Sequence, residues 1–133
     1  TAQPGYLAWS KTAKNRKQMM KKVLECSTDF EPDEKSEYSN TNFILLGYIV
    51  EDITGKSYGE VLKEKITEPL GLDNTYMGKK AVATENEALS FAASKSGWQP
   101  KSETHMSIPH GAGAIVSTTE DLTKFFAGLF DGK

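Results

Sequence analysis

The sequence contains very little cysteine, and this scarcity limits the chemistry that the chain can support. Cys26 is the single cysteine, so the chain can form no internal disulfide and offers no cysteine set for zinc. Cys26 follows an apolar stripe at helical spacing, and we therefore expect it to be a small core residue. The stripe consists of Met19, Met20, Val23 and Leu24. Long apolar runs are also lacking, because none approaches the roughly 18 residues that suggest a membrane span.

A strong net charge is absent as well. The chain has 16 basic and 18 acidic residues, and its net charge of −2 gives no general attraction to nucleic acid or to an anionic membrane. The charges are nevertheless segregated: residues 11–22 hold six basic residues and no acid, and residues 25–37 hold six acids and one lysine. This pattern predicts a solvated helix face followed by an acidic loop. Five of the six basic residues are lysines without interleaved aromatics, which argues against a nucleic-acid groove.

Two short motifs resemble parts of an esterase, but the context that such a site requires is missing. "GKSYG" (55–59) matches the Gly-x-Ser-x-Gly nucleophile elbow, which needs a strand leading into the serine. The preceding residues have a helical pattern instead. "HGAG" (110–113) follows the supposed elbow, although an oxyanion loop should precede it. We therefore interpret Ser57 as a helix N-cap and not as a nucleophile.

Metal-binding patterns are not visible either. His105 and His110 are the only histidines, and no obvious Asp, Glu or Cys accompanies them at ligand spacing. We expect both to be loop residues, and we predict neither a metal site nor a cofactor.

What the sequence does contain is mainly helical periodicity. We predict four helices, over residues 13–26, 40–54, 57–68 and 118–130. The second is so apolar that it should be buried on most sides, and Gly47 within it suggests that another backbone packs closely there. Gly55 should end the second helix, and Pro69 the third. The last helix carries an unbroken apolar stripe that must pack on another surface.

Residues 77–110 lack this periodicity. We predict a long loop with one weak hairpin around Ser96-Gly97, and a loop of such length usually has a function or lies against a missing neighbour. "GAGAIVS" (111–117) then predicts a short buried strand or a tight turn.

The segment "EYSNTNFILLGY" (37–48) places Tyr38 and Asn40 directly before the second apolar helix. Backbone just before a helix is extended or turn-like, so these two side chains can face one cleft together. A phenol needs cationic neighbours to act as a base at neutral pH, and an amide can both accept and donate hydrogen bonds. Tyr38 therefore either moves a proton or is only a ring packed near a helix start. The tripeptide alone leaves both alternatives open.

Four ordered segments extend this pattern along the chain. They are Tyr-Ser-Asn before the apolar helix, Glu-Pro-Leu-Gly-Leu (68–72), Thr75, and Gly-Ala-Gly through Ser-Thr to Asp-Leu and Phe (111–129). Over about residues 24–133 the chain resembles the serine β-lactamase and penicillin-binding protein superfamily. It is most similar to the branch that holds class C β-lactamases, D-alanyl-D-alanine carboxypeptidases and related esterases.

The resemblance implies a mainly α fold class: the helical subdomain of the β-lactamase/transpeptidase-like (α+β) fold, with a long loop and one or two short strands. Residues 1–133 would form a single partial domain. Tyr38 would be the general base and acid that shuttles the proton of a serine nucleophile. Asn40 would hydrogen-bond the catalytic lysine and the amide carbonyl of the substrate.

Two further motifs of the family do not occur in the chain. None of the eleven serines has lysine three positions later, and neither Lys-Thr-Gly nor His-x-Gly is present. The sequence therefore favours a fragment of a longer serine hydrolase that acylates its serine with a β-lactam, a D-amino-acid peptide or a small ester. The alternative is a non-catalytic homologue that acts as a scaffold for cell-wall peptide or for a protein partner.

On the first interpretation the chain alone is inactive, and its partner in the longer protein is a small-molecule or peptide substrate, not nucleic acid. No membrane segment is expected within these residues. The apolar faces of such a fragment can self-associate. The resemblance also implies a periplasmic or extracellular location.

Overall fold

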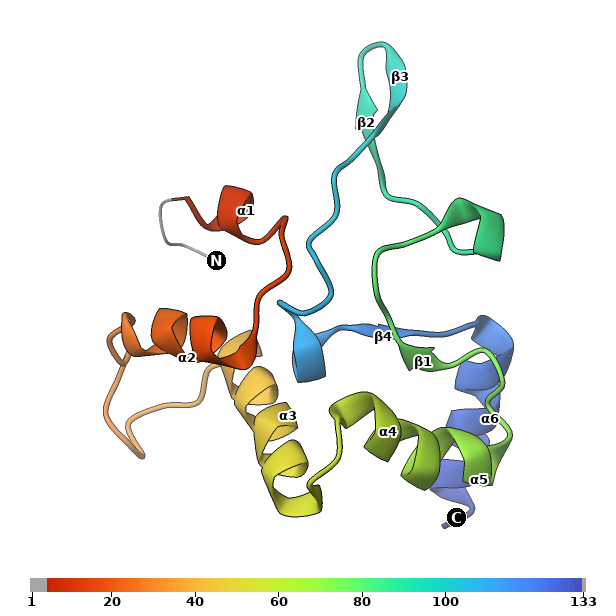
Figure 1. Cartoon of the computed structure of the whole chain (residues 1–133), viewed down its shortest axis with the longest axis horizontal. Coiled ribbons are helices and arrows are strands. Elements are labelled where there is room, and N and C mark those ends of the chain that lie inside the picture. The colour runs from red at the N-terminus through yellow and green to blue at the C-terminus, as the bar shows by residue number, and fades with distance from the viewer. Residues whose placement is uncertain (1–4, 133) are drawn as a thin grey trace. The chain divides into compact units, whose positions relative to one another are not determined.

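The computed structural model describes residues 5–132, which form two compact units. The first unit joins Thr1–Glu37 to Lys79–Pro109, and the second joins Tyr38–Gly78 to His110–Lys133. Each unit is thus built from two separate stretches of the chain. Figure 1 shows the helices and strands with their labels.

The first unit contains α2 (Arg16–Leu24), which begins at a capping box. The Asn15 side chain accepts a hydrogen bond from the N–H of Gln18, and the Gln18 side chain accepts one from the N–H of Asn15 (both 2.9 Å). α2 confirms the first predicted helix, but it ends two residues before Cys26. Cys26 is exposed, so our prediction that it is a core residue is wrong: the helical spacing does not continue that far.

Hydrogen bonds fasten the start of this unit to a later loop. After the single turn α1 (Tyr6–Trp9), the Ser10 carbonyl accepts a hydrogen bond from the N–H of His105 (2.8 Å). The Ser107 hydroxyl accepts one from the N–H of Lys14 (2.9 Å). Among the residues of this unit that the structure describes, the buried side chains are Ser10, Met19 and Ile108.

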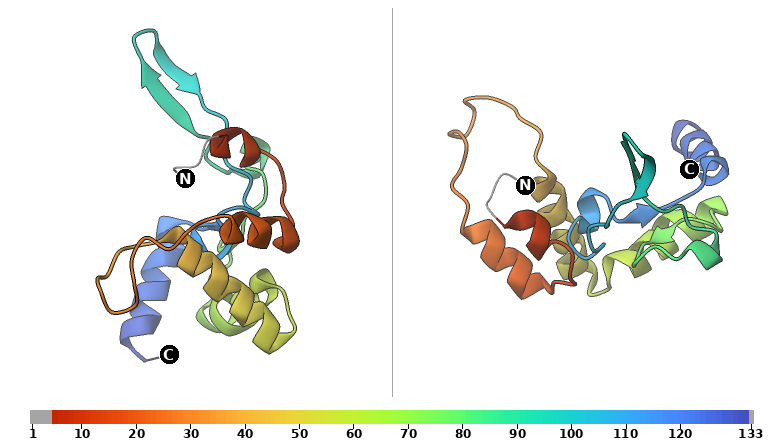
Figure 2. Two further views of the ribbon diagram at one scale, coloured as in Figure 1. Left: turned by 90° about the vertical axis from the view of Figure 1, so that its left-hand side faces the viewer. Right: turned by 90° about the horizontal axis from the view of Figure 1, so that it is seen from above.

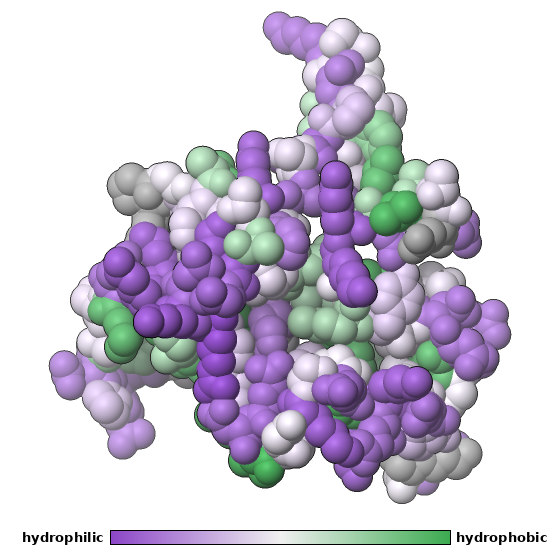
Figure 3. All heavy atoms as spheres, in the orientation of Figure 1, coloured by the Kyte–Doolittle hydropathy of each residue, from purple (hydrophilic) through white to green (hydrophobic). Residues whose placement is uncertain are grey.

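A hairpin replaces much of the predicted long loop. β2 (Phe91–Ser94) pairs antiparallel with β3 (Gly97–Pro100), and the 3-10 turn η2 (Ala83–Glu85) precedes them. Lys95 and Ser96 form the turn, and Gly97 has a φ of +99°, which glycine adopts without strain. The hairpin predicted around Ser96-Gly97 is therefore confirmed. The left view of Figure 2 shows its paired arrows, and Figure 3 shows its tip as hydrophilic.

The second unit begins with α3 (Asn40–Thr54), which has the predicted bounds. Gly55 ends it in the left-handed conformation (φ +65°), as expected for a helix C-cap. Ser57 then starts α4 (Tyr58–Leu62) with the predicted capping box, in which Glu60 is the partner.

Our prediction that Pro69 ends this third helix is wrong. α4 runs on through a π-helical turn, η1 (Lys63–Thr67), into α5 (Glu68–Leu70), and the helix ends at Gly71. A proline in an α-helix lacks the N–H that would bond four residues back, and its ring collides with that carbonyl. The wider π-turn just before Pro69 avoids this conflict, with the N–H of Glu68 donating to the carbonyl of Lys63 five residues back.

The remaining elements of the second unit come from its second stretch. A 3-10 turn, η3 (His110–Ala112), leads into β4 (Ile115–Val116), which pairs antiparallel with β1 (Tyr76–Met77). α6 (Thr119–Phe130) follows, capped by the Thr118 hydroxyl, which accepts a hydrogen bond from the N–H of Asp121. The predicted last helix is confirmed. A short strand does lie within 111–117, but the expectation that it is buried is wrong, because Ile115 is 45% exposed.

Only one side of α3 is buried, so the expectation that it is buried on most sides is wrong. Ile44 and Tyr48 are buried, whereas Phe43, Leu46 and Ile53 on another side are exposed. The apolar stripe of α6 is also largely exposed. The exposed residues of that stripe are Leu122, Phe126, Leu129 and Phe130.

The predicted fold class needs correction. Helices still predominate, but instead of one or two short strands the structure has four strands in two separate two-stranded antiparallel sheets. Of the described residues, 46% lie in helices and 9% in strands. The prediction missed strands because short pairs such as β1 and β4 join residues about 40 positions apart. Local sequence patterns do not reveal such pairing. Within residues 5–132, no helix combines the length and the apolar character that crossing a membrane requires.

Candidate active site

The start of α3 brings the two predicted site residues together. Ser39, the N-cap, is extended (φ −138°, ψ 122°), so the side chains on either side of it point to the same side of the chain. The Tyr38 hydroxyl donates a hydrogen bond to Oδ1 of Asn40 over 3.0 Å. The two residues therefore form one polar pair at the N-terminus of α3.

This pair lies at the surface. Tyr38 is 72% exposed and Asn40 is exposed, so water and a substrate can reach both polar groups. The Tyr38 ring also packs against Phe43, with ring centroids 5.3 Å apart and planes tilted by 34°. The Ser39 side chain makes no capping hydrogen bond. The N–H groups at the start of any helix carry a partial positive charge, which favours negative charge nearby.

A second polar cluster surrounds His110 at η3. Nε2 of His110 lies 3.3 Å from Oε1 of Glu51, which also accepts a hydrogen bond from the N–H of Tyr58 (2.9 Å). The imidazole ring packs between the rings of Tyr48 (4.7 Å) and Tyr58 (5.3 Å). Nδ1 of His110 is buried without a hydrogen-bond partner. The cluster ties η3 to α3 and α4, and its half-buried imidazole is a packing group.

Close approach of backbones completes this junction. A Cβ on Gly47 would lie 2.5 Å from Nδ1 of His110, and one on Gly111 would lie 2.6 Å from the Phe43 carbonyl oxygen. The prediction that another backbone packs against Gly47 is confirmed. η3 therefore presses directly on the half of α3 that begins at the Tyr38–Asn40 pair.

A third cluster centres on Asp121, which is 1% exposed. Its Oδ2 accepts hydrogen bonds from the N–H of Asn74 (2.8 Å) and from the hydroxyl of Thr75 (2.9 Å). The Thr75 hydroxyl also lies 2.8 Å from that of Ser117. These contacts join the start of α6 to the loop before β1, so this cluster holds the fold together.

The two histidines and Ser57 do not form a catalytic group with one another. His105 lies in a turn, where its Nδ1 is 3.0 Å from the Ser107 hydroxyl. Ser57 is the N-cap of α4, and its hydroxyl donates to Oε2 of Glu60 (2.6 Å). Hydrogen bonds from the Ser57 side chain and backbone lower the pKa of Glu60. The described residues contain no group of three His, Cys, Asp or Glu side chains placed to hold a metal ion.

The chain contains one further short motif, the Lys-x-Gly triplet of Lys95, Ser96 and Gly97. The triplet spans the turn of the β2–β3 hairpin and precedes α6 in the chain. It belongs to the first unit, whereas Tyr38 and Asn40 belong to the second. Gly97 of this triplet has the positive φ that the hairpin turn requires, which accounts for a glycine at this position.

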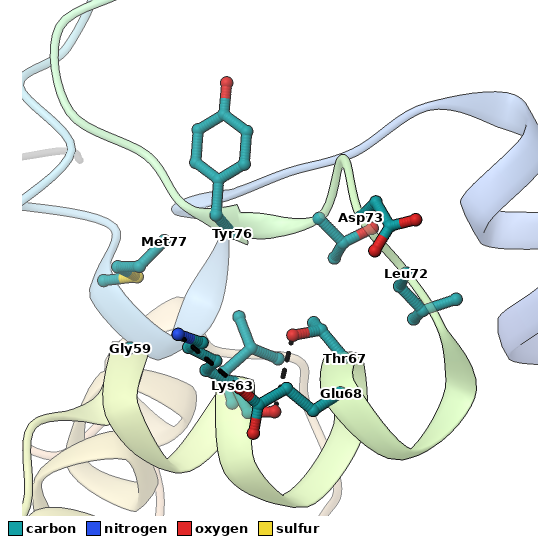
Figure 4. A pocket seen from close by; sticks show the side chains of 10 residues that line it. Gly59, Lys63, Thr67, Glu68, Leu72, Asp73, Tyr76 and Met77 are labelled. Atoms are coloured by element: carbon teal, nitrogen blue, oxygen red, sulfur yellow. Dashed lines mark hydrogen bonds and ion pairs between the residues drawn. The ribbon is translucent and has the colours of Figure 1, made fainter.

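An open pocket lies beside η1 in the second unit, lined by residues of α4, η1 and the segment before and within β1. Figure 4 shows Lys63, Glu68 and Thr67 on one side, with Met77 facing them and the Tyr76 ring turned away. Lys63 pairs with Glu68 (3.5 Å), and the Thr67 hydroxyl donates to the Lys63 carbonyl. Neither Tyr38 nor Asn40 lines this pocket, so the pocket is separate from the pair at the start of α3.

The chain is similar to known proteins in both sequence and fold. The whole chain, residues 1–133, matches the protein-family model described as Beta-lactamase. It is 34% identical over 97 residues to an unguisins hydrolase of Aspergillus campestris, covering 70% of this chain and 18% of that protein. It is 29% identical to the teichoic acid D-alanine hydrolase of Staphylococcus aureus, covering 90% of this chain and 30% of the other.

Among solved structures, the chain is similar to a D-stereospecific amidohydrolase from a Streptomyces species. The TM-score is 0.79 at 30% sequence identity, and the match covers 97% of this chain and 39% of that one. The chain therefore spans well under half the length of each of these proteins.

Proposed function

The chain belongs to the beta-lactamase family, and from that premise we propose that it is the helical part of a longer serine hydrolase and carries that enzyme's Tyr-x-Asn element. The observation that carries the proposal is the hydrogen bond from Tyr38 to Asn40 at the exposed start of α3. An enzyme needs its proton carrier and its hydrogen-bonding amide on one accessible surface, and this pair meets that requirement.

For the substrate we propose a D-aminoacyl amide or ester. Two of the similar proteins are named for this chemistry, a D-stereospecific amidohydrolase and a teichoic acid D-alanine hydrolase. Both cleave an acyl group from nitrogen or oxygen, which a serine nucleophile can do through an acyl-enzyme. A teichoic acid substrate also supports a location outside the cytoplasm for the longer protein.

In the proposed reaction the nucleophilic serine comes from a part of the longer protein outside these 133 residues. Tyr38, as a phenolate, takes the proton from the serine hydroxyl while the serine oxygen bonds to the acyl carbon. When the tetrahedral intermediate collapses, Tyr38 gives that proton to the leaving nitrogen or oxygen, and the acyl-enzyme remains. Water then attacks the acyl carbon, and Tyr38 carries its proton to the departing serine oxygen.

Asn40 has a binding role in this proposal. Its amide N–H groups donate to the carbonyl of the substrate, and its Oδ1 accepts from a catalytic lysine. In the chain as described here, Oδ1 accepts from Tyr38.

The test is Tyr38→Phe in the longer protein that contains this chain. The change keeps the ring and removes the hydroxyl, so kcat/KM on a D-alanyl ester or amide should fall about 10²- to 10⁴-fold with an unchanged Tm. Tyr6→Phe in α1 is the matched control, because it removes a hydroxyl from the other unit and should leave kcat/KM unchanged. A Tyr38→Phe protein that keeps more than about a third of the activity would remove Tyr38 from the mechanism.

The same proposal makes the 133-residue chain inactive by itself. No serine in it is followed by lysine three positions later, and Ser57 is engaged as a helix cap. Incubation with a fluorescent penicillin, followed by mass spectrometry, should show no covalent adduct. An adduct on Ser57 would overturn the assignment of that residue as a cap alone.

A further inference from the structure

Phe43 is the residue that contacts the ring of Tyr38. Their ring centroids are 5.3 Å apart and the planes are tilted by 34°. This geometry lies within the range of about 4.5–7 Å at which aromatic pairs attract each other beyond simple burial. The contact is a side-chain pair across the first turn of α3, where the Tyr38 hydroxyl also meets Asn40.

The positions of Tyr38 and Phe43 relative to the start of α3 match a known helix-capping motif. Ser39 is the N-cap of α3, so Tyr38 stands just before the cap and Phe43 is the fourth helical residue. A contact between these two positions is the hydrophobic staple, which fixes the angle at which the chain enters a helix. Ser39 makes no side-chain capping bond. The contact between Tyr38 and Phe43 therefore connects the residue before the cap to the first turn of the helix.

The two partners of the staple are held differently. The Phe43 backbone lies inside the helix and against η3, where a Cβ on Gly111 would come within 2.6 Å of the Phe43 carbonyl oxygen. Tyr38 precedes the helix and is 72% exposed. A ring carried by helical backbone, itself 42% exposed, therefore packs against one whose own backbone lies outside the regular helix.

We propose that Phe43 is a positioning residue: its ring holds the Tyr38 phenol in one orientation, directed at Asn40. A hydrogen bond at the hydroxyl fixes only the end of the side chain, whereas packing along the ring restricts both torsion angles that carry it. A proton carrier must be held within about 0.5 Å of its productive position, and neighbouring side chains must supply that restraint. The consequence for catalysis rests on the proposed function of Tyr38, but the restraint on the ring does not.

The first measurement follows the orientation of the ring. In the full-length protein with labelled tyrosine, the Tyr38 signals are assigned by their loss in Tyr38→Phe, and side-chain couplings report the rotamer. Phe43→Leu keeps an apolar side chain without a ring and should give averaged couplings at Tyr38. Phe43→Tyr keeps the ring and should preserve a single rotamer. A single rotamer in Phe43→Leu would overturn the proposal.

The second measurement follows activity in the same proteins. Phe43→Leu should lower kcat about tenfold while KM and Tm change little, because misplacement of a reacting group by about 1 Å can cost up to 100-fold. Phe43→Tyr should restore kcat. Glu120→Ala is the control, since the Glu120 side chain is 78% exposed, polar and carried by α6 instead of α3. It should leave kcat unchanged.

The two proposals can fail separately. If Phe43→Leu frees the ring but Tyr38→Phe leaves activity intact, the proposed function is wrong and the positioning of Tyr38 stands. If Tyr38→Phe abolishes activity but Phe43→Leu changes neither the rotamer nor kcat, the positioning is wrong and the proposed function stands.

Discussion

Asp121 carries a carboxylate that is almost fully buried, and its contacts reach far along the chain. One oxygen accepts hydrogen bonds from Asn74 and Thr75, more than 45 positions away. The other has no hydrogen-bond partner, although Nζ of Lys124 lies 3.8 Å from it. A buried carboxylate is costly unless its partners compensate for lost hydration, so the hydrogen bonds from Asn74 and Thr75 must offset that cost.

We predict that Asp121→Ala strongly destabilises the protein. The substitution leaves the N–H of Asn74 and the hydroxyl of Thr75 without their acceptor, at a cost of about 2–4 kcal/mol in the free energy of unfolding. Urea denaturation measures the loss. Glu120→Ala is the control, because the neighbouring Glu120 side chain is 78% exposed and should matter little. A loss below about 1 kcal/mol for Asp121→Ala would contradict this account.

Ser57 offers a prediction that depends on pH. Its hydroxyl and N–H lower the pKa of Glu60, so this interaction stabilises the folded state above the ordinary carboxyl pKa and is lost as the pH falls through the lowered value. Ser57→Ala should therefore raise the pKa of Glu60, as followed by NMR, and lower Tm at neutral pH by a few degrees. The difference in Tm should narrow under acidic conditions. An unchanged pKa of Glu60 would show that the capping box does not form.

At the scale of elements, the junction between α3 and η3 supports the helix whose N-terminus carries the proposed site. Gly47 and Gly111 let the two backbones approach, and the His110 ring fills the space between Tyr48 and Tyr58. Glu51 holds that ring and the N-terminus of α4 together. The helix that carries Tyr38 and Asn40 is thus braced along the side away from solvent.

We predict opposite effects for two glycine substitutions in helices. Alanine favours a helix over glycine by about 1 kcal/mol. In Gly47→Ala the new methyl meets the packed His110 ring at 2.5 Å, so overpacking of about 1–3 kcal/mol should outweigh that gain. In Gly128→Ala of α6 the methyl meets the flexible end of Leu70, which can move, so the protein should keep its stability or gain some. Thermal unfolding of both variants tests this, and equal effects would contradict it.

Much of the helical layout could be predicted from the sequence because its signals are local. The bounds of α3, the cap at Ser57 and the C-cap at Gly55 follow from apolar spacing and cap residues within a few positions. The π-turn before Pro69 was missed, because a proline signals a conflict without saying how the helix resolves it. The β1–β4 pair was missed because two-residue strands carry no period of their own.

The candidate site also has parts that could be predicted from local sequence patterns and parts that could not. Tyr38 and Asn40 could be placed on one side of the chain because only one residue separates them. Phe43 was not noticed as a partner of Tyr38, although the five-residue spacing of the hydrophobic staple was available as a signal. The Glu51–His110 pair spans 59 positions, and no local pattern connects residues so far apart.

At the scale of the whole molecule, apolar side chains remain on the surface of the second unit. Phe43, Leu46 and Ile53 of α3 are exposed, and so is the stripe of α6. Isolated apolar residues on a surface are common, but stripes along two helices form contiguous patches. The chain spans only 18–39% of the proteins it was compared with. We propose that the rest of the longer protein covers these helices.

We predict that the 133-residue chain, produced alone, self-associates. Contiguous apolar patches drive association in water, and Phe130 at the end of α6 is 84% exposed. Light scattering coupled to size-exclusion chromatography should show dimers or larger species whose proportion rises with concentration. Phe130→Glu places a charge in the α6 stripe and should shift the distribution toward the monomer. Thr123→Glu adds the same charge to an exposed polar position of the same helix and should change little. A stable monomer at all concentrations would show that the exposed stripes do not form an adhesive surface.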